Sequence, residues 1–155
     1  MSTSTPVYVA AGSNVAPLAN LRLALAVLDR HFAPLEVSHA YANAAVGFEG
    51  DDFVNLVVGF RSALPLPAVI ERLHQAEAAC GRERDAPKWA PRSMDLDILL
   101  FGDFICDEPA LRLPRPDLLR RPYMLGPAAE IAPDLRHPTD GRTLGELWRE
   151  MQRGQ

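Results

Sequence analysis

The stretch FVNLVVGF, residues 53–60, is the clearest β-strand in the chain and decides the fold class. Its side chains alternate between two faces with the two-residue period of a strand. One face is wholly apolar and consists of Val54, Leu56, Val58 and Phe60. The other face places a polar residue, Asn55, between Phe53 and Val57. Because a buried amide without a hydrogen-bonding partner is costly, we expect Asn55 to have a specific partner.

Three more strands and two helices flank this stretch. Apolar or alternating patterns predict strands at residues 7–11, 35–41 and 94–101. A first helix starts near Pro17, ends before Pro34 and carries an apolar stripe of Leu18, Leu21, Leu25, Leu28 and Phe32. A second helix starts near Pro65 and Pro67 and carries a stripe of Val69, Leu73, Ala76 and Cys80. This order predicts an α+β protein with a ferredoxin-like βαββαβ antiparallel sheet and helices packed on one face.

Beyond Gly102 the chain is rich in proline and is predicted to hold only short helical turns before a final helix. Thr143 and Glu146 have the spacing of a capping box and mark the start of that helix. Its buried face is predicted to consist of Leu144, Leu147, Trp148 and Met151. No repeat or linker interrupts the sequence, so we expect residues 1–155 to form one domain, with additional C-terminal helices.

Composition narrows the class of protein. Apolar residues make up 48% of the chain and charged residues 23%, which is the range of globular proteins. The net charge of −4 argues against a general nucleic-acid or membrane binder. No apolar run is long enough to cross a bilayer, and the N-terminus lacks the pattern of a secretion signal. Since Cys80 and Cys106 are far apart, we expect two free thiols in a cytoplasmic, monomeric protein.

Asp95 and Asp97 lie two residues apart on the predicted strand at 94–101, so both carboxylates project from one face. Two like charges side by side repel each other unless a cation bridges them. A hard divalent ion, above all Mg²⁺, suits carboxylate oxygens combined with substrate phosphates. For such a pair alone, a solvated polar strand edge is the competing interpretation.

The segment before this strand supplies cations and one large aromatic ring. Pro87 and Pro91 make it a loop, and its four positive charges are Arg82, Arg84, Lys88 and Arg92. Glu83 and Asp85 partly offset them, so a salt-bridged surface loop is the alternative. Trp89 is harder to explain in that way, because a ring of this size in a charged loop is typical of a stacking surface. Together with a Mg²⁺ site, these residues indicate binding of a nucleotide and a flat heterocycle.

The run RDAPKWAPRSMDLDI, residues 84–98, resembles the signature R-W-G/A-P-R-x-x-D-x-D-I/L of the 6-hydroxymethyl-7,8-dihydropterin pyrophosphokinase family. The resemblance covers nearly the whole chain, through G-S-N at 12–14, D-F-V-N at 52–55, E-x-x-x-G-R at 77–82, R-P-Y-M-L at 121–125 and E-I-A-P-D-L at 130–135. The family has the ferredoxin-like fold expected from the periodicity. Its members transfer pyrophosphate from ATP to the hydroxymethyl group of a reduced pterin and release AMP, in folate biosynthesis.

The resemblance also implies roles for individual residues. Two Mg²⁺ ions would bridge ATP and the pterin hydroxyl, held by Asp95 and Asp97. The implied catalytic residues are Arg82, Arg92, Asp95 and Asp97. The implied ATP contacts are His74, Glu77, Arg84, Trp89, Ile98, Arg115 and Arg121. The implied pterin contacts are Ala44, Val46, Phe53, Asn55 and Tyr123, with Phe53 and Tyr123 stacking on the ring. For His74 or Glu77 alone, a solvated helix face is the alternative.

The sequence departs from the family pattern at three places, which lie in the implied pterin-binding and phosphate-binding parts of the site. After Tyr41 the family usually has Arg-Thr and a proline-rich loop, but this chain reads ANAA at residues 42–45. Arg115 replaces a proline-flanked histidine, and arginine cannot share a proton near neutral pH. Asp85 replaces a residue that is commonly basic. Two alternatives to the pyrophosphokinase therefore remain: a non-catalytic paralogue that binds pterin or nucleotide and regulates another folate enzyme, and a phosphoryl-transfer enzyme with a different acceptor alcohol.

Overall fold

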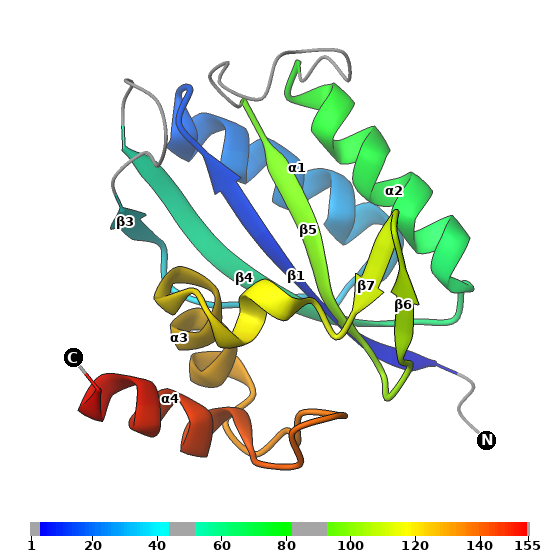
Figure 1. The fold of residues 1–155 in the computed structure, drawn as a ribbon. Coiled ribbons are helices and arrows are strands. Elements are labelled where there is room, and N and C mark those ends of the chain that lie inside the picture. Colours follow the sequence, from blue (N-terminus) through cyan, green and yellow to red (C-terminus); the bar gives the residue numbers. More distant parts are fainter. Residues whose placement is uncertain (1–3, 44–51, 82–92, 155) are drawn as a thin grey trace.

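The computed structural model describes residues 4–43, 52–81 and 93–154 (Figure 1). In this part of the chain the elements are β1 (Thr5–Ser13), α1 (Pro17–Phe32), β2 (Glu36–Val37), β3 (Tyr41–Asn43), β4 (Phe53–Ser62), α2 (Leu66–Ala79), β5 (Asp95–Phe101), β6 (Cys106–Glu108), β7 (Leu111–Leu113), the 3₁₀ helix η1 (Pro116–Leu119), α3 (Pro122–Ile131) and α4 (Leu144–Arg153). No helix in these ranges is both long enough and apolar enough to span a bilayer.

The main sheet is antiparallel, and its strand order is β2-β4-β1-β5, with β3 also pairing to β4. This is the order that the ferredoxin-like prediction requires, so that prediction is confirmed. Helices α1 and α2 cover one face of the sheet, and α3 and α4 lie on the other (Figure 1). A separate hairpin of β6 and β7 follows β5.

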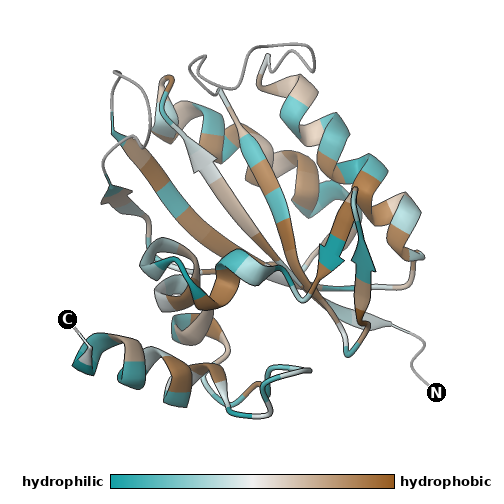
Figure 2. Ribbon diagram, viewed as in Figure 1, coloured by the Kyte–Doolittle hydropathy of each residue, from teal (hydrophilic) through white to brown (hydrophobic). Residues whose placement is uncertain are grey.

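The first core lies between the sheet and helices α1 and α2. Leu56, Val58 and Phe60 enter it from β4, as their alternation predicts, and the Phe60 ring stacks on Phe32 of α1 at a centroid distance of 4.3 Å. In Figure 2, β4 and β5 are brown over much of their length, interrupted by teal hydrophilic bands. The predicted stripe of α2 is buried throughout. The stripe of α1 is wrong at Leu18, which is 61% exposed, because it lies in the first turn beyond the edge of the core.

The second core lies between the sheet and the C-terminal helices, and a bulge in β5 supplies part of it. Tyr8 pairs with Leu100 and Val9 pairs with Ile98, so Leu99 is an extra residue in β5. Both Leu99 and Leu100 therefore face the second core, which strict alternation does not allow. The capping box at Thr143 is present, and Leu144 and Leu147 are buried against α3 as predicted.

Two predictions of secondary structure are wrong. The expected strand at 35–41 is divided into β2 and β3, because the Ser38 hydroxyl accepts a hydrogen bond from Val57 N at 2.9 Å in place of a backbone carbonyl. The region after Gly102 holds more than short turns, since α3 is a ten-residue helix. Its prolines do not break it: Pro122 lies in the first turn, where a missing N–H costs little, and buried packing compensates for Pro127.

Glu77 connects α2 to the start of β5. Its side chain is only 9% exposed, and Oε2 accepts a hydrogen bond from Leu96 N at 2.9 Å. Leu96 is the core residue between Asp95 and Asp97, so Glu77 holds the backbone that carries both aspartates. The interpretation of Glu77 as part of a solvated helix face is therefore wrong.

Replacement of Glu77 by Ala should lower the free energy of unfolding by about 2 kcal/mol, because the buried Leu96 N–H would lose a charged acceptor. Glu77→Gln keeps an acceptor of the same reach and should lose less than half as much. Urea unfolding monitored by circular dichroism measures both values. Equal losses for the two variants would show that this hydrogen bond does not hold β5.

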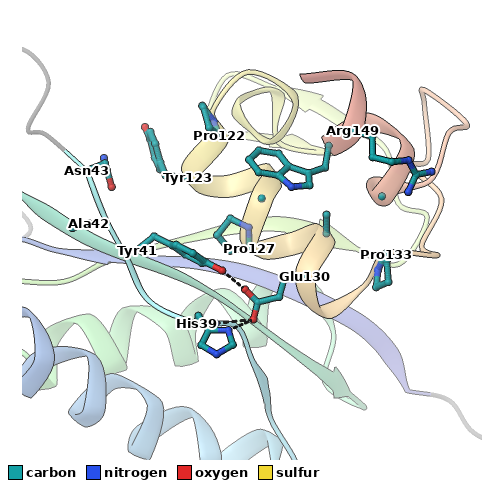
Figure 3. A pocket seen from close by; sticks show the side chains of 14 residues that line it. His39, Tyr41, Ala42, Asn43, Pro122, Tyr123, Pro127, Glu130, Pro133 and Arg149 are labelled. Carbon is teal, nitrogen blue, oxygen red and sulfur yellow. Dashed lines mark hydrogen bonds and ion pairs between the residues drawn. The ribbon is translucent and has the colours of Figure 1, made fainter. Parts of the chain in front are cut away.

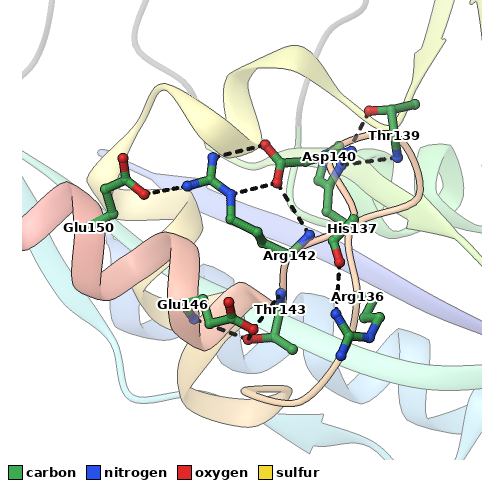
Figure 4. A network of polar contacts seen from close by, with 9 residues as sticks. Arg136, His137, Thr139, Asp140, Arg142, Thr143, Glu146 and Glu150 are labelled. Carbon is green, nitrogen blue, oxygen red and sulfur yellow. Dashed lines mark hydrogen bonds and ion pairs between the residues drawn. The ribbon is translucent and has the colours of Figure 1, made fainter.

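A loop before α4 carries a network of hydrogen bonds and ion pairs (Figure 4). His137 is buried, and its Nδ1 accepts hydrogen bonds from Thr139 N at 3.3 Å and Asp140 N at 3.1 Å. Burial lowers the pKa of His137, and the charge of Asp140 opposes this only in part. The imidazole is therefore neutral in the fold. Hydrogen bonds from Arg142 lower the pKa of Asp140 to about 2, so Asp140 stays ionised at all pH values near neutrality.

The folded state binds fewer protons at His137 than the unfolded chain, so stability from this group is present above pH 6.5 and is lost as the pH falls. We predict that the free energy of unfolding decreases between pH 7.5 and 5. His137→Asn keeps an acceptor near Nδ1 but does not titrate, and it should flatten this dependence. Urea unfolding at a series of pH values is the measurement. An unchanged slope in the variant would assign the dependence to another group.

Candidate active site

One row of residues crosses three strands of the sheet. Gly12 of β1 pairs with Asn55 of β4 on one side and with Asp95 of β5 on the other. Residues that lie directly opposite each other in antiparallel strands project from the same face. Asn55 and Asp95 therefore lie on one face, separated by two strand spacings or about 10 Å. This is the face that α3 and α4 cover only in part.

Gly12, in the middle of this row, leaves space for the side chain of Asn55. A Cβ atom at Gly12 would come to 2.6 Å from Asn55 Oδ1 and to 3.8 Å from Phe53. Any side chain there would displace the amide, so the close approach requires glycine. The next residue, Ser13, donates a hydrogen bond from its hydroxyl to Ser93 O at 2.7 Å and so fixes the chain as it enters β5.

Asn55 is held by a neighbouring amide. It is 8% exposed, and its Nδ2 donates to Oδ1 of Asn43, on β3, at 2.5 Å. Phe53 lies two residues away on the same strand, so the predicted pair of Phe53 and Asn55 does share a face. The expectation that Asn55 has a specific partner is confirmed, and that partner is Asn43.

A cluster of alternating charges surrounds Asp97. Arg115 Nη2 lies 3.7 Å from Asp97 Oδ1 and 3.8 Å from Asp117 Oδ2. Arg121 Nε lies 3.9 Å from Asp117 Oδ1. The backbone of Arg115 donates from N to Leu99 O at 2.9 Å, which anchors the residue beside β5. Its Nε is buried and has no hydrogen-bond partner among the described residues, so a further acceptor is needed at this point.

Tyr123 brings an aromatic ring to the same region. It lies in the first turn of α3 and is half-buried. Burial raises the pKa of Tyr123, an effect that Arg121 opposes and that Asp117 and Asp97 reinforce. The phenol is therefore neutral at physiological pH. The charges of Asp97, Arg115, Asp117 and Arg121 all act on this phenol.

A cavity of about 740 Å³ adjoins the row, between β3 on one side and α3 and α4 on the other (Figure 3). Its volume is typical of small-molecule sites. Asn43 and Tyr123 line it, together with Tyr41 and Trp148, but neither aspartate of β5 does. The cavity therefore extends the site away from Asp95.

Glu130 of α3 binds residues at the start of β3, beside this cavity. Its carboxylate accepts hydrogen bonds from His39 N at 2.9 Å and from the Tyr41 hydroxyl at 2.5 Å, and it also contacts His39 Nδ1 at 2.8 Å (Figure 3). Partial burial opposes ionisation, but the hydrogen bonds from Tyr41 and His39 outweigh it and lower the pKa of Glu130. The carboxylate therefore holds β3 against α3 as an anion.

The remaining predicted site residues divide into three groups. His74 lies half-buried on α2, three residues before Glu77. Ile98 is 7% exposed and packs in the first core, on the face opposite the aspartates. The others lie outside the described residues, and these are Ala44, Val46, Arg82, Arg84, Trp89 and Arg92.

Several residues of the site were not predicted from the sequence. Asn43, Asp117 and Glu130 enter it only through contacts made between distant segments. The role of Gly12 could have been predicted, because a glycine at the end of an apolar strand often marks a close backbone approach.

Within the described residues no cluster of three or more histidine, cysteine, aspartate or glutamate side chains could hold a metal.

Comparison with known proteins identifies the family. The family model for "7,8-dihydro-6-hydroxymethylpterin-pyrophosphokinase (HPPK)" matches residues 8–133. The 2-amino-4-hydroxy-6-hydroxymethyldihydropteridine pyrophosphokinase of Pseudomonas aeruginosa is 40% identical over 145 residues, which cover 91% of this chain and 88% of that protein. The enzyme of the same name from Synechocystis is 37% identical over 143 residues, with 90% and 72% covered.

A crystal structure of wild-type Plasmodium falciparum HPPK-DHPS with pteroate has the same fold, with a TM-score of 0.75. At 12% identity it covers 96% of this chain, which spans only 44% of that longer protein. The chain therefore belongs to the 7,8-dihydro-6-hydroxymethylpterin-pyrophosphokinase family, and its activity is the pyrophosphokinase reaction of folate biosynthesis.

Proposed function

We propose that the row of Asn55, Gly12 and Asp95 aligns the two substrates of this reaction. Asn55 binds the ring of 6-hydroxymethyl-7,8-dihydropterin, and Asp95 lies where the hydroxymethyl group meets ATP. The hydroxyl oxygen attacks the β-phosphorus and gives up its proton to solvent, the bond from that phosphorus to the α,β-bridging oxygen breaks, and AMP leaves. The strand register that places Asn55 and Asp95 on either side of Gly12, two strand spacings or about 10 Å apart, is the observation that supports this assignment.

Asp95 and Asp97 are the residues that would hold Mg²⁺. Both are half-exposed carboxylates on one strand face, and one or two carboxylates plus substrate phosphates are the usual ligands of this ion. Two bound ions would supply charge neutralisation at the attacking and leaving oxygens. Leu96 is anchored in the core between Asp95 and Asp97, which directs both aspartates to the opposite face of the sheet.

The cations around Asp97 position the phosphates. The guanidinium of Arg115 has a buried Nε without a hydrogen-bond partner in the described part of the chain, and a phosphate oxygen is a suitable acceptor. Arg121 lies beyond Asp117 in the same cluster. We assign the further phosphate contacts to Arg82, Arg84 and Arg92, and adenosine contacts to Trp89 and His74, on the resemblance of the sequence. The resemblance also implies adenosine contacts for Glu77 and Ile98, but the Glu77 side chain is engaged by Leu96 N and the Ile98 side chain is buried in the first core.

The pterin ring is assigned to the face between Phe53 and Tyr123. Asn55 would hydrogen-bond its amide-like edge, and residues of the segment from Ala44 to Val46 would complete the pocket on the resemblance of the sequence. The phenol of Tyr123 is neutral, so it can lie against a neutral heterocycle without a charge penalty. We further assign the chain to the cytoplasm as a single-domain monomer, in keeping with its acidic net charge of −4 and its two free cysteines.

A paralogue with a changed acceptor is the second candidate function. Asn43 lies on the acceptor side of the site and Arg115 on the phosphate side, and both positions depart from the family pattern. These departures concern the geometry of binding rather than the aspartates of β5. A regulator without catalytic activity has no comparable support.

Activity separates these functions. We expect AMP release from ATP that depends on both Mg²⁺ and 6-hydroxymethyl-7,8-dihydropterin, measured in a coupled assay. Asp97→Ala should lower kcat by about 1,000-fold, since charge stabilisation at the transferred group would be lost. The matched control is Asp103→Ala, at an exposed position in the turn after β5, which should stay within about twofold of the wild type.

Release of AMP only with another alcohol would favour the second candidate. Binding of ATP without any AMP release would contradict the proposed reaction. An Asp97→Ala variant that keeps a tenth or more of the activity would remove Asp97 from the metal assignment.

A further inference from the structure

The Asn55 carboxamide has two possible orientations, which differ by a rotation of about 180° around its last bond. One orientation presents a carbonyl oxygen where the other presents an NH₂ group. A heterocycle with a donor next to an acceptor can pair with only one of them. The orientation of Asn55 therefore decides which edge of a ring can bind.

Two contacts fix this orientation. Asn55 Oδ1 lies 2.6 Å from the position that a Cβ of Gly12 would take, so it faces a C–H group of that glycine. Oxygen accepts weakly from such a group, whereas an NH₂ group there would meet only another hydrogen. On the other side, Asn55 Nδ2 donates to Asn43 Oδ1 at 2.5 Å. A rotated Asn55 would place its NH₂ group against Gly12, and it would also break the hydrogen bond with Asn43 unless the Asn43 carboxamide rotated with it.

We propose that Asn43 is a positioning residue that sets the acceptor specificity of the enzyme by holding the Asn55 carboxamide in this orientation. The inference rests on the proposed role of Asn55 in binding the pterin. With Oδ1 against Gly12 and one N–H of Nδ2 on Asn43, Asn55 keeps one N–H and an oxygen lone pair side by side. This pair complements a lactam edge, in which a ring N–H lies next to a carbonyl.

The placement of Asn43 suits this role. It lies on the edge strand β3, opposite Phe53 in the register, so its side chain shares the face of Asn55. Among the residues that the structure describes, its side chain makes no other hydrogen bond than the one from Asn55. Glu130 fixes the start of the same strand through Tyr41, so β3 cannot withdraw from the site without breaking that contact. Asn43 is therefore held in place by a contact from α3, and it holds Asn55 of β4 in turn.

A matched pair of variants tests the inference. Asn43→Asp keeps an acceptor at the same reach, and Asn43→Leu has nearly the same size without any acceptor. Titration calorimetry with 6-hydroxymethyl-7,8-dihydropterin, in the presence of a non-hydrolysable ATP analogue, should give a Kd raised about tenfold or more in Asn43→Leu. Asn43→Asp should stay within about threefold of the wild type. Both variants should bind the ATP analogue alone as the wild type does.

Nuclear magnetic resonance of the free protein separates this inference from the proposed function. The Asn55 side-chain NH₂ resonances, identified by their loss in Asn55→Asp, should move upfield in Asn43→Leu and remain near their wild-type positions in Asn43→Asp. If Asn43→Leu does not fold, the pair Asn43→Thr and Asn43→Val replaces it, since these differ only by a hydroxyl acceptor.

An Asn43→Leu protein that binds the pterin within twofold of the wild type would overturn the inference, as would an equal loss in Asn43→Asp. Unmoved Asn55 resonances in Asn43→Leu would overturn it as well. A wild-type protein that binds no pterin would instead contradict the proposed function, while the resonances would still report on the contact between the two amides.

Discussion

The register at Gly12 is the constraint on which the rest of the site depends. This residue pairs with Asn55 on one strand and with Asp95 on another, and it has no side chain to separate them. Because side chains alternate along a strand, a slip of one residue in either pairing would turn Asn55 or Asp95 to the opposite face. The cores on both sides of the sheet oppose that slip, since it would disrupt the packing of the apolar residues of β4 and β5 on both faces. The packing of the two cores thus keeps Asn55 and Asp95 aligned on one face of the sheet.

The C-terminal segment adds a second layer that also builds the site. Helix α3 carries Tyr123 at its start and Glu130 near its end, and the segment before it carries Arg115 and Asp117. Through Glu130 the helix holds β3, and through Asn43 that strand holds Asn55. The acceptor end of the site is therefore assembled by side-chain contacts between segments distant in sequence. The aspartate end depends instead on one strand, whose backbone is held by Glu77.

This difference explains how much the sequence could predict. Alternation over residues 53–60 and 94–98 follows from the backbone geometry of a strand, so the faces of Asn55, Asp95 and Asp97 could be predicted. The extra residue at Leu99 could not, because a bulge adds no signal to an apolar run. Helix α3 was missed because its prolines indicate a break, and only the packing of its buried face compensates for them. The contacts of Asn43 and Glu130 span many residues, and no local pattern encodes them.

The link between the two ends of the row can be measured by paramagnetic relaxation. With Mn²⁺ and a non-hydrolysable ATP analogue bound, the Asn55 side-chain amide should relax as expected for a metal on the order of 10 Å away, two strand spacings across the sheet. Replacing Asp95 and Asp97 by Asn should abolish this enhancement, and Asp103→Asn should leave it unchanged. An enhancement that survives the loss of both carboxylates, or one that is absent from the wild-type complex, would contradict the alignment of the metal and the pterin ring across Gly12.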